Sequence, residues 1–248
     1  MKNVIAVASG KGGVGKTWFS ITLSHTLANN NKKVLLFDAD LGLANVDIQL
    51  GLMAPHDLGE VVAGRITLNQ AIATFDAGNF DVLVGRSGSG GLANIPIGRL
   101  QMLWDDLMIV AKSYDKTILD LGAGVEKNVR LFSKNAGSII VICTDEPTSL
   151  TDAYAFIKVS VMDNPKANIK IVINAANSVR EGQRTYETLL KACNSFLKIS
   201  PPLLGIIRRD TKVRDAIRNQ KSIITRYPNT EAAEDVDKIA KLILQDEN

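Results

Sequence analysis

The chain contains few residues of the types that form disulfide frameworks or metal centres. Its 248 residues include two cysteines, Cys143 and Cys193, and two histidines, His25 and His56. The cysteines are far apart in the sequence, which excludes a disulfide framework and the ligand spacing of a structural metal site. Each histidine is isolated as well, so we expect His25 on a helix and His56 in a loop, and neither as a metal ligand.

The sequence also lacks a long hydrophobic segment. No apolar run approaches the ~20 residues that a membrane-spanning helix requires, and no signal peptide precedes the first expected strand. The formal net charge is +3, with 46% hydrophobic and 22% charged residues, which is typical of a soluble globular protein and indicates little about its partners. No internal repeat, low-complexity segment or linker divides the chain. We therefore expect a cytoplasmic protein with a single domain over residues 1–248.

Short apolar runs alternate along the chain with segments of helical periodicity. The expected strands are Val4–Ala8, Val34–Phe37, Val82–Val84, Thr117–Leu119, Ser138–Cys143, Ile169–Ile173 and Leu204–Ile207. The expected helices are Thr17–Asn30, Ile97–Lys112, Leu150–Met162 and Gln183–Leu197, and Gly85–Asn94 is expected to be a surface loop. Because the strand runs are continuously apolar, the pattern predicts a doubly wound, mostly parallel α/β sheet with helices on both faces.

A glycine-rich segment between the first strand and the first helix has the spacing of a phosphate-binding loop. It runs from Gly10 to Thr17 with the sequence GKGGVGKT. In such a loop, successive backbone N–H groups surround phosphate oxygens, and the helix N-terminus adds its partial positive charge at the same point. Lys16 is expected to bind the β- and γ-phosphates, and the Thr17 hydroxyl to bind Mg²⁺. A glycine-rich turn that binds no nucleotide would not require Lys and Thr at these positions.

Three aspartates follow apolar runs that are expected to be strands. Asp38 and Asp40 end the second run, and Asp120 ends another. Carboxylates at the carboxyl ends of parallel strands face the crevice in which ligands bind. An isolated aspartate at such a place can simply form a turn, but several of them around a phosphate-binding loop predict a magnesium site.

Several segments together resemble the MinD/ParA ATPases, and the resemblance covers nearly the whole chain. The phosphate-binding loop has the deviant Walker A form of that family, KGGVGKT, with a second lysine at Lys11. The other similar segments are DADLGLANVDIQLGL from Asp38, TLNQAI from Thr67, DLGAGV from Asp120, DEPTSLTDAYAFIK from Asp145 and VRDAIRNQKSIITRYPNTEAAEDV from Val213. These segments look like those of the FlhG and MinD branch.

The resemblance implies an ATPase that binds ATP or ADP with Mg²⁺ and forms a homodimer when ATP is bound. In the dimer, Lys11 would cross the interface to phosphate oxygens of the partner's nucleotide, where it offsets negative charge. Asp40 would position or activate the attacking water, so Lys11, Lys16 and Asp40 are the expected catalytic residues. Hydrolysis would loosen the dimer, and we expect slow turnover that an unidentified activator or cargo protein accelerates.

The resemblance also assigns binding residues. The expected nucleotide contacts are Gly12, Gly13, Val14, Gly15, Lys16, Thr17, Trp18, Asn45, Asn174, Arg208 and Asp210, and the expected Mg²⁺ residues are Thr17, Asp38 and Asp120. The sequence departs from the family at three places. Leu121 stands where Ser, Thr or Cys is frequent, so a hydroxyl there cannot contribute. Arg208 replaces a usual proline, and the N-terminal extension with which FlhG stimulates a flagellar GTPase is missing.

Two functions remain open within this family. One is an FlhG- or MinD-like switch that regulates the placement or number of a cellular structure, such as a flagellum or a polar organelle. The other is a ParA-like ATPase that binds nucleoid DNA without sequence preference and positions or partitions a cargo. The expected DNA surface comprises Arg208, Arg209, Lys212, Arg214, Arg218 and Lys221. A solvated basic face or a docking site for an acidic partner is the alternative for these residues. The protein would be associated with a cell pole or with the nucleoid.

The remaining segments argue against other classes. The expected C-terminal helix has one apolar face, which is formed by Val236, Ile239, Ala240 and Ile243. Its polar face carries several acids and it has no aromatic residue, so we expect a packed helix and no stable membrane anchor. Cys143 in a buried strand and Cys193 in a helix do not suit an iron–sulfur cluster. No glutamine-hydrolysing domain or carboxylate-substrate pocket indicates an amidoligase, and the tyrosine-rich tail of bacterial tyrosine kinases is absent.

Overall fold

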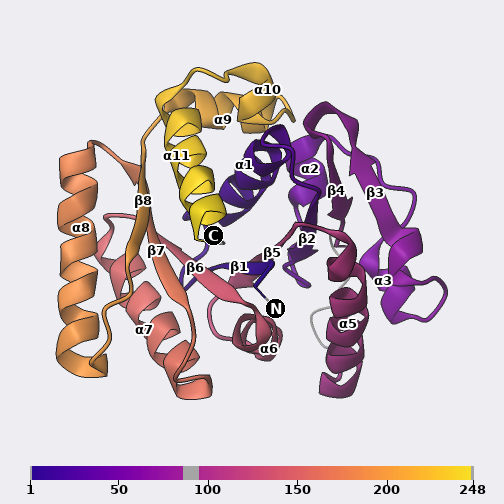
Figure 1. Ribbon diagram of the computed structural model, residues 1–248, viewed down its shortest axis with the longest axis horizontal. Helices are drawn as coiled ribbons and strands as arrows, with labels where there is room; N and C mark the ends of the chain where they lie inside the picture. The colour runs from indigo at the N-terminus through magenta and orange to yellow at the C-terminus, as the bar shows by residue number, and fades with distance from the viewer. Residues whose placement is uncertain (1, 86–94, 247–248) are drawn as a thin grey trace.

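The computed structural model describes residues 2–85 and 95–246, whose strands form one eight-stranded sheet in the order β3-β4-β2-β5-β1-β6-β7-β8 (Figure 1). The strands are β1 (Val4–Ser9), β2 (Val34–Ala39), β3 (Ile72–Phe75), β4 (Phe80–Leu83), β5 (Lys116–Ala123), β6 (Ser138–Cys143), β7 (Ile169–Ala176) and β8 (Leu203–Arg208). All neighbouring pairs are parallel except β3 and β4, which pair antiparallel at the sheet edge. The predicted doubly wound, mostly parallel sheet is therefore confirmed.

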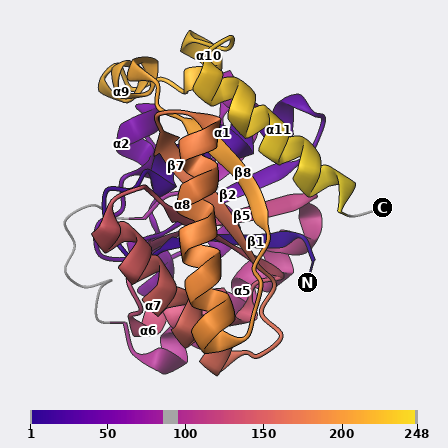
Figure 2. The same cartoon turned by 90° about the vertical axis from the view of Figure 1, so that its left-hand side faces the viewer.

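Helices cover both faces of this sheet. They are α1 (Lys16–Asn29), α2 (Val46–Leu50), α3 (Leu58–Val62), α5 (Ile97–Val110), α6 (Lys127–Asn135), α7 (Pro147–Asp163), α8 (Val179–Ala192), α9 (Thr211–Arg218), α10 (Ile223–Arg226) and α11 (Glu231–Gln245). Figure 2 shows α9, α10 and α11 on the opposite side of the sheet from α5, α6 and α7. Successive strand residues point to opposite faces, so in β1 Val4 and Ala6 enter one core while Ile5 and Val7 enter the other.

The C-terminal helix uses its apolar face inside the fold. Helix α11 packs on β8 and α1, and the four residues of its expected apolar face, Val236, Ile239, Ala240 and Ile243, are all buried. The prediction of a packed helix is confirmed. Within residues 2–85 and 95–246, no helix has both the length and the apolar character needed to cross a bilayer.

Several elements differ from the predictions, and the short helices α2, α3 and α10 were not among the expected helices. Strand β3 was not expected, because it is a partly exposed edge strand without a continuous apolar run. Helix α6 was also missed, since only three of its residues are buried and the rest of its sequence is polar. Helix α8 begins at Val179, where the Ser178 side chain accepts a hydrogen bond from the Glu181 N–H. It ends at Ala192 and is followed by a short π-helix. Of the expected surface loop, all but Gly85 lies outside the described residues.

His25 lies on α1, as predicted, and is almost completely buried. Its side chain is 4% exposed, and Nδ1 lies 2.8 Å from Ser222 Oγ. Burial lowers the pKa of the imidazole to about 4. Between pH 6.5 and pH 4, the unfolded chain therefore binds a proton that the folded chain does not, and stability is lost as the pH falls through this window.

We expect His25 alone to reduce the free energy of unfolding by about 2 kcal/mol between pH 7.5 and pH 5. Urea unfolding of wild type and of His25→Gln at the two pH values measures this contribution, because glutamine can still bond to Ser222 but does not titrate. An equal pH dependence in wild type and His25→Gln would show that burial does not affect this imidazole.

Candidate functional site

The glycine-rich segment between β1 and α1 forms one wall of a cavity of about 710 Å³. Gly13 and Gly15 have φ angles of +78° and +96°, a conformation that residues with a Cβ adopt only with strain. A Cβ placed on Gly12 or Gly13 would meet no atom within 4 Å, so the backbone there borders open space. No side chain caps the first N–H groups of α1. These groups can bind an anion in the cavity.

Lys16 is a largely buried cation at the floor of this cavity. Its side chain is 8% exposed, and Nζ donates a hydrogen bond of 3.0 Å to Ser9 Oγ. Burial lowers the pKa of Lys16, while Asp120 and Asp40 oppose that shift. Ser9 Oγ also donates to the Lys11 carbonyl at 2.6 Å, so this hydroxyl connects the lysine to the loop backbone. Ser9 was not among the expected site residues, although its place at the end of β1 could have indicated a role in the site.

Asp38, near the end of β2, and Asp120, within β5, are adjacent buried carboxylates and register partners. Burial raises the pKa of Asp120 to about 6. Burial, together with the charge of Asp120, raises the pKa of Asp38 well above its ordinary value, although the N–H groups of Asn45 and Val46 bond to its carboxylate. Two desolvated negative charges of this kind are stabilised by a bound cation.

The residues around the aspartate pair fit a magnesium site completed by the nucleotide and water. The Thr17 and Ser20 hydroxyls both hydrogen-bond to Asp120. Among the described residues, no group of three or more His, Cys, Asp or Glu side chains could hold a metal ion. That composition suits Mg²⁺, which binds through few protein ligands and retains phosphate oxygens and several waters. Ser20 is a further residue that the sequence analysis missed.

Asp40 and the residues around the end of β5 line the same cavity. Asp40 Oδ1 accepts a hydrogen bond of 3.0 Å from the Leu43 N–H, and a Cβ on Gly122 would lie 3.3 Å from the same oxygen. The end of β5 adds Gly122 and Ala123 to the cavity lining, and the segment that leads into α6 adds Glu126 and Asn128. None of these four was expected. Leu121 is fully buried in the core beneath, so it presents no group to the cavity.

The structure brings most of the expected binding residues to this cavity. Those that line it are Gly12, Gly13, Gly15, Lys16, Thr17, Trp18, Asp40 and Asn45. Trp18 is buried, and its indole N–H has no hydrogen-bond partner in the described part of the chain. Val14 lies in the loop with its side chain buried. Lys11 does not line the cavity, because Nζ bonds instead to Glu146 and Thr148.

The three residues expected near the base have other contacts. The Asn174 amide donates to the Val14 carbonyl at 2.8 Å and so supports the glycine-rich loop from beneath. Asp210 caps α9, where its carboxylate accepts a hydrogen bond from the Lys212 N–H. Neither residue lines the cavity of about 710 Å³, and Arg208 does not line it either.

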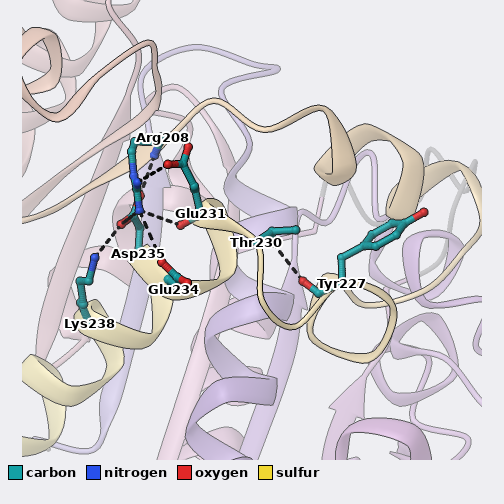
Figure 3. Close-up of polar contacts among 7 residues, drawn as sticks. All are labelled: Arg208, Tyr227, Thr230, Glu231, Glu234, Asp235 and Lys238. Carbon is teal, nitrogen blue, oxygen red and sulfur yellow. Dashed lines mark hydrogen bonds and ion pairs between the residues drawn. The ribbon is translucent and has the colours of Figure 1, made fainter.

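Arg208 joins β8 to α11 through an ion-pair cluster (Figure 3). Asp235 accepts hydrogen bonds from Arg208 Nε at 2.7 Å and Nη2 at 2.8 Å, and Glu231 accepts one from Nη1 at 2.6 Å. Asp235 is 4% exposed, and its pKa is lowered because the Arg208 bonds outweigh the opposing effect of burial. The guanidinium is therefore already neutralised within the fold. This geometry favours a structural role for Arg208 over contact with a base or with DNA phosphates.

Cys143 was expected in a buried strand and Cys193 in a helix, and both side chains are buried. Cys143 is in β6, and Cys193 is the first residue of the short π-helix after α8. Burial raises the pKa of the Cys143 thiol to about 12 and that of the Cys193 thiol to about 11. Neither thiol is exposed on the surface.

Comparison with known proteins supports the interpretation of this cavity as a nucleotide-binding site. The model of the CobQ/CobB/MinD/ParA nucleotide binding domain matches residues 5–223. The antiactivator FleN of Pseudomonas aeruginosa is 34% identical over 230 residues, which are 93% of this chain and 82% of that protein. The flagellum site-determining protein YlxH of Helicobacter pylori is 31% identical over 241 residues, which are 97% of this chain and 81% of that protein.

A solved structure shares the fold over nearly the whole length of both chains. It is the septum site-determining protein MinD of Pyrococcus horikoshii in complex with Mg-ADP, with a TM-score of 0.83 and 24% identity. The alignment covers 98% of this chain and 96% of that chain. The family match, the two relatives and the phosphate-binding cavity agree. The chain therefore belongs to the CobQ/CobB/MinD/ParA family of nucleotide-binding ATPases, and its relatives include FleN and MinD.

Proposed function

We propose that this protein is an ATP-binding and slowly hydrolysing switch that dimerises with ATP and regulates the placement or number of a cellular structure. The arrangement of Lys16 and Asp40 in the lining of one cavity, with the buried pair Asp38 and Asp120 near Lys16, carries this proposal. The names of two relatives, an antiactivator and a flagellum site-determining protein, favour a flagellar or polar structure as the target.

Each residue around the cavity would then have a distinct role. Lys16 and the N–H groups of Gly13, Gly15 and α1 would bind the phosphates, and Asn45 would lie in the segment that responds to the nucleotide. Bound Mg²⁺ neutralises phosphate charge, and Thr17 with Asp38 and Asp120 would hold it, the carboxylates through water. Asp40, which lines the same cavity, would orient the attacking water.

The scarcity of cationic side chains in the cavity lining supports slow ATP turnover by a single subunit. Lys16 is the one Lys or Arg side chain in the lining formed by the described residues. Phosphoryl transfer is fast where an additional arginine or lysine stabilises the transition-state charge, and it is slow without one. A second cation would have to come from another molecule. Lys11 of a second copy and a basic residue of an activator are the two sources that we propose.

Lys11→Ala is expected to weaken ATP-dependent dimerisation much more than nucleotide binding by a single subunit. Lys11 does not border its own cavity, so the variant should bind ADP with an affinity within about fivefold of the wild-type value, the upper end for exposed charge pairs. Titration with a fluorescent ADP and sedimentation with ATP measure the two properties. An equal loss of both would mean that Lys11 acts within its own subunit.

The cellular role can be tested in the native host. Cells that lack the gene, and cells that carry only Asp40→Ala, should differ from wild type in the number or position of flagella or of a polar structure. Electron microscopy provides the count. Unchanged number and position in both strains would contradict a placement function.

The alternative function, non-specific DNA binding, is favoured by one observation. Lys212, Arg214, Arg218 and Lys221 lie on or just after α9, are exposed, and make no ion pair within the described residues. If this face binds DNA, retention on DNA should require ATP and should fall steeply between 50 and 200 mM salt, by roughly tenfold or more for a few phosphate contacts. Arg214→Glu with Arg218→Glu should abolish retention. Retention that is equal with ATP and ADP would argue against this alternative.

A further inference from the structure

Lys11 has a defined position in a single subunit. Its Nζ lies 2.5 Å from Glu146 Oε2 and 2.9 Å from Thr148 Oγ1. Both partners are at the N-terminal end of α7. Glu146 is the residue before α7 begins at Pro147, and its side chain caps no helix N–H group. The Glu146 carboxylate is therefore available to the lysine.

The glycine-rich loop and α7 are in direct backbone contact, which fixes the distance between the partners. A Cβ on Gly10 would lie 2.0 Å from the carbonyl oxygen of Asp152, so only glycine allows the loop to approach α7 this closely. Lys11 follows Gly10, and the helix start that carries Glu146 and Thr148 faces it. The contact is a property of one folded subunit, and it requires no second copy.

We propose that Glu146, assisted by Thr148, restrains Lys11 within its own subunit and so raises the amount of ATP-bound protein needed to form a dimer. This inference rests on the proposed function, in which Lys11 serves the nucleotide of a second copy. A lysine cannot bind Glu146 and a partner's phosphate together, so dimer formation must break one contact in each subunit. Glu146 is thus a positioning residue that acts through Lys11.

Arg209 offers Glu146 a second cation when Lys11 leaves. The charge of Arg209 contributes to the lowered pKa of Glu146, although less than Lys11 does. Arg209 Nε donates to the Ala175 carbonyl at 3.3 Å, at the end of β7. Because Arg209 remains nearby, release of Lys11 does not leave Glu146 without a positive neighbour. The contact can therefore open without a large penalty.

The expected strength of the contact is modest, because it is near the surface. The Lys11 and Glu146 side chains are 36% and 61% exposed, and exposed ion pairs shift equilibria by roughly 1.4- to 5-fold. Formation of a dimer breaks two such contacts, one in each subunit. The fold-change in the dimer dissociation constant is therefore the square of the fold-change for one contact. We expect Glu146→Gln to strengthen ATP-dependent dimerisation by roughly 2- to 25-fold.

The experiment has two arms, both with the full chain. In the first, carboxyl-detected NMR follows the pKa of Glu146 in the nucleotide-free protein, with Glu146→Gln to assign the resonance. The pKa should be below its ordinary value in wild type and should rise in Lys11→Ala. In the second, light scattering measures the dimer dissociation constant in saturating ATP·Mg²⁺, in an Asp40→Ala background that preserves ATP.

Asp145→Asn is the matched control, because it removes one negative charge from the neighbouring exposed residue. The dissociation constant should fall for Glu146→Gln and should be unchanged for Asp145→Asn. A Glu146 pKa that does not respond to Lys11→Ala would overturn the contact. A dissociation constant that is unchanged or raised in Glu146→Gln would overturn the restraint. If no variant dimerises with ATP, the proposed switch and the restraint both fail, and the first arm still reports whether the contact exists.

Discussion

Asp40→Ala is expected to reduce ATP turnover by about a hundredfold or more, the usual effect of losing the group that orients or deprotonates a nucleophile. Nucleotide affinity should change little, because the variant leaves the phosphate-binding groups, Lys16 and the glycine-rich loop, in place. The Asp40 carboxylate accepts a hydrogen bond from the Leu43 N–H, which supports the segment before Asn45. Phosphate release in steady state and binding of a fluorescent ADP measure the two quantities.

Asp40→Asn separates the charge of this side chain from its support of the loop. Asparagine retains an oxygen that can accept the Leu43 hydrogen bond, but it has no negative charge to polarise water. We expect this variant to be as inactive as Asp40→Ala while it retains the wild-type thermal stability. Normal turnover in either variant would show that another group handles the water.

Arg208→Ala is expected to lower the free energy of unfolding by about 2–3 kcal/mol. Loss of one partner of a buried ion pair typically costs about 3–5 kcal/mol, because the remaining charge is uncompensated. Here the loss is smaller, because Arg208 is partly exposed and Lys238 stays 3.1 Å from Asp235. Urea unfolding at pH 7.5 provides the measurement.

Arg226→Ala is the matched control for Arg208→Ala. Arg226 pairs with Asp215, and the two side chains are 38% and 42% exposed, so its removal should lower the free energy of unfolding much less than the removal of Arg208 does. Nucleotide affinity distinguishes the two roles considered for Arg208. A loss of affinity of tenfold or more in Arg208→Ala, without a loss of stability, would restore its expected contact with the base and contradict the structural role.

The sequence was sufficient for the parts of the fold and site that rest on local patterns. Continuous apolar runs located seven strands, and the spacing of glycines with Lys16 and Thr17 located the phosphate-binding loop. Strand-end position was enough to place Asp38 beside Asp120, because parallel strands end at one edge of the sheet.

The parts that the sequence did not reveal depend on contacts between distant segments. Ser20 acts through Asp120, 100 residues away, and Lys11 bonds to Glu146, 135 residues away. Arg208 could be noted as a departure from the family, but its partner on α11 follows only from the packing of that helix on β8. Such pairs carry no periodic signal in a single sequence.

Molar mass in solution tests the central claim most directly. Light scattering on wild type and Asp40→Ala, with ADP·Mg²⁺ and then with ATP·Mg²⁺, compares a monomer of 26.8 kDa with a dimer of twice that mass. We expect a monomer with ADP and a dimer with ATP, most completely in Asp40→Ala, where ATP is not consumed. A mass that is the same with both nucleotides would contradict the switch and leave Lys11 without a partner nucleotide to reach.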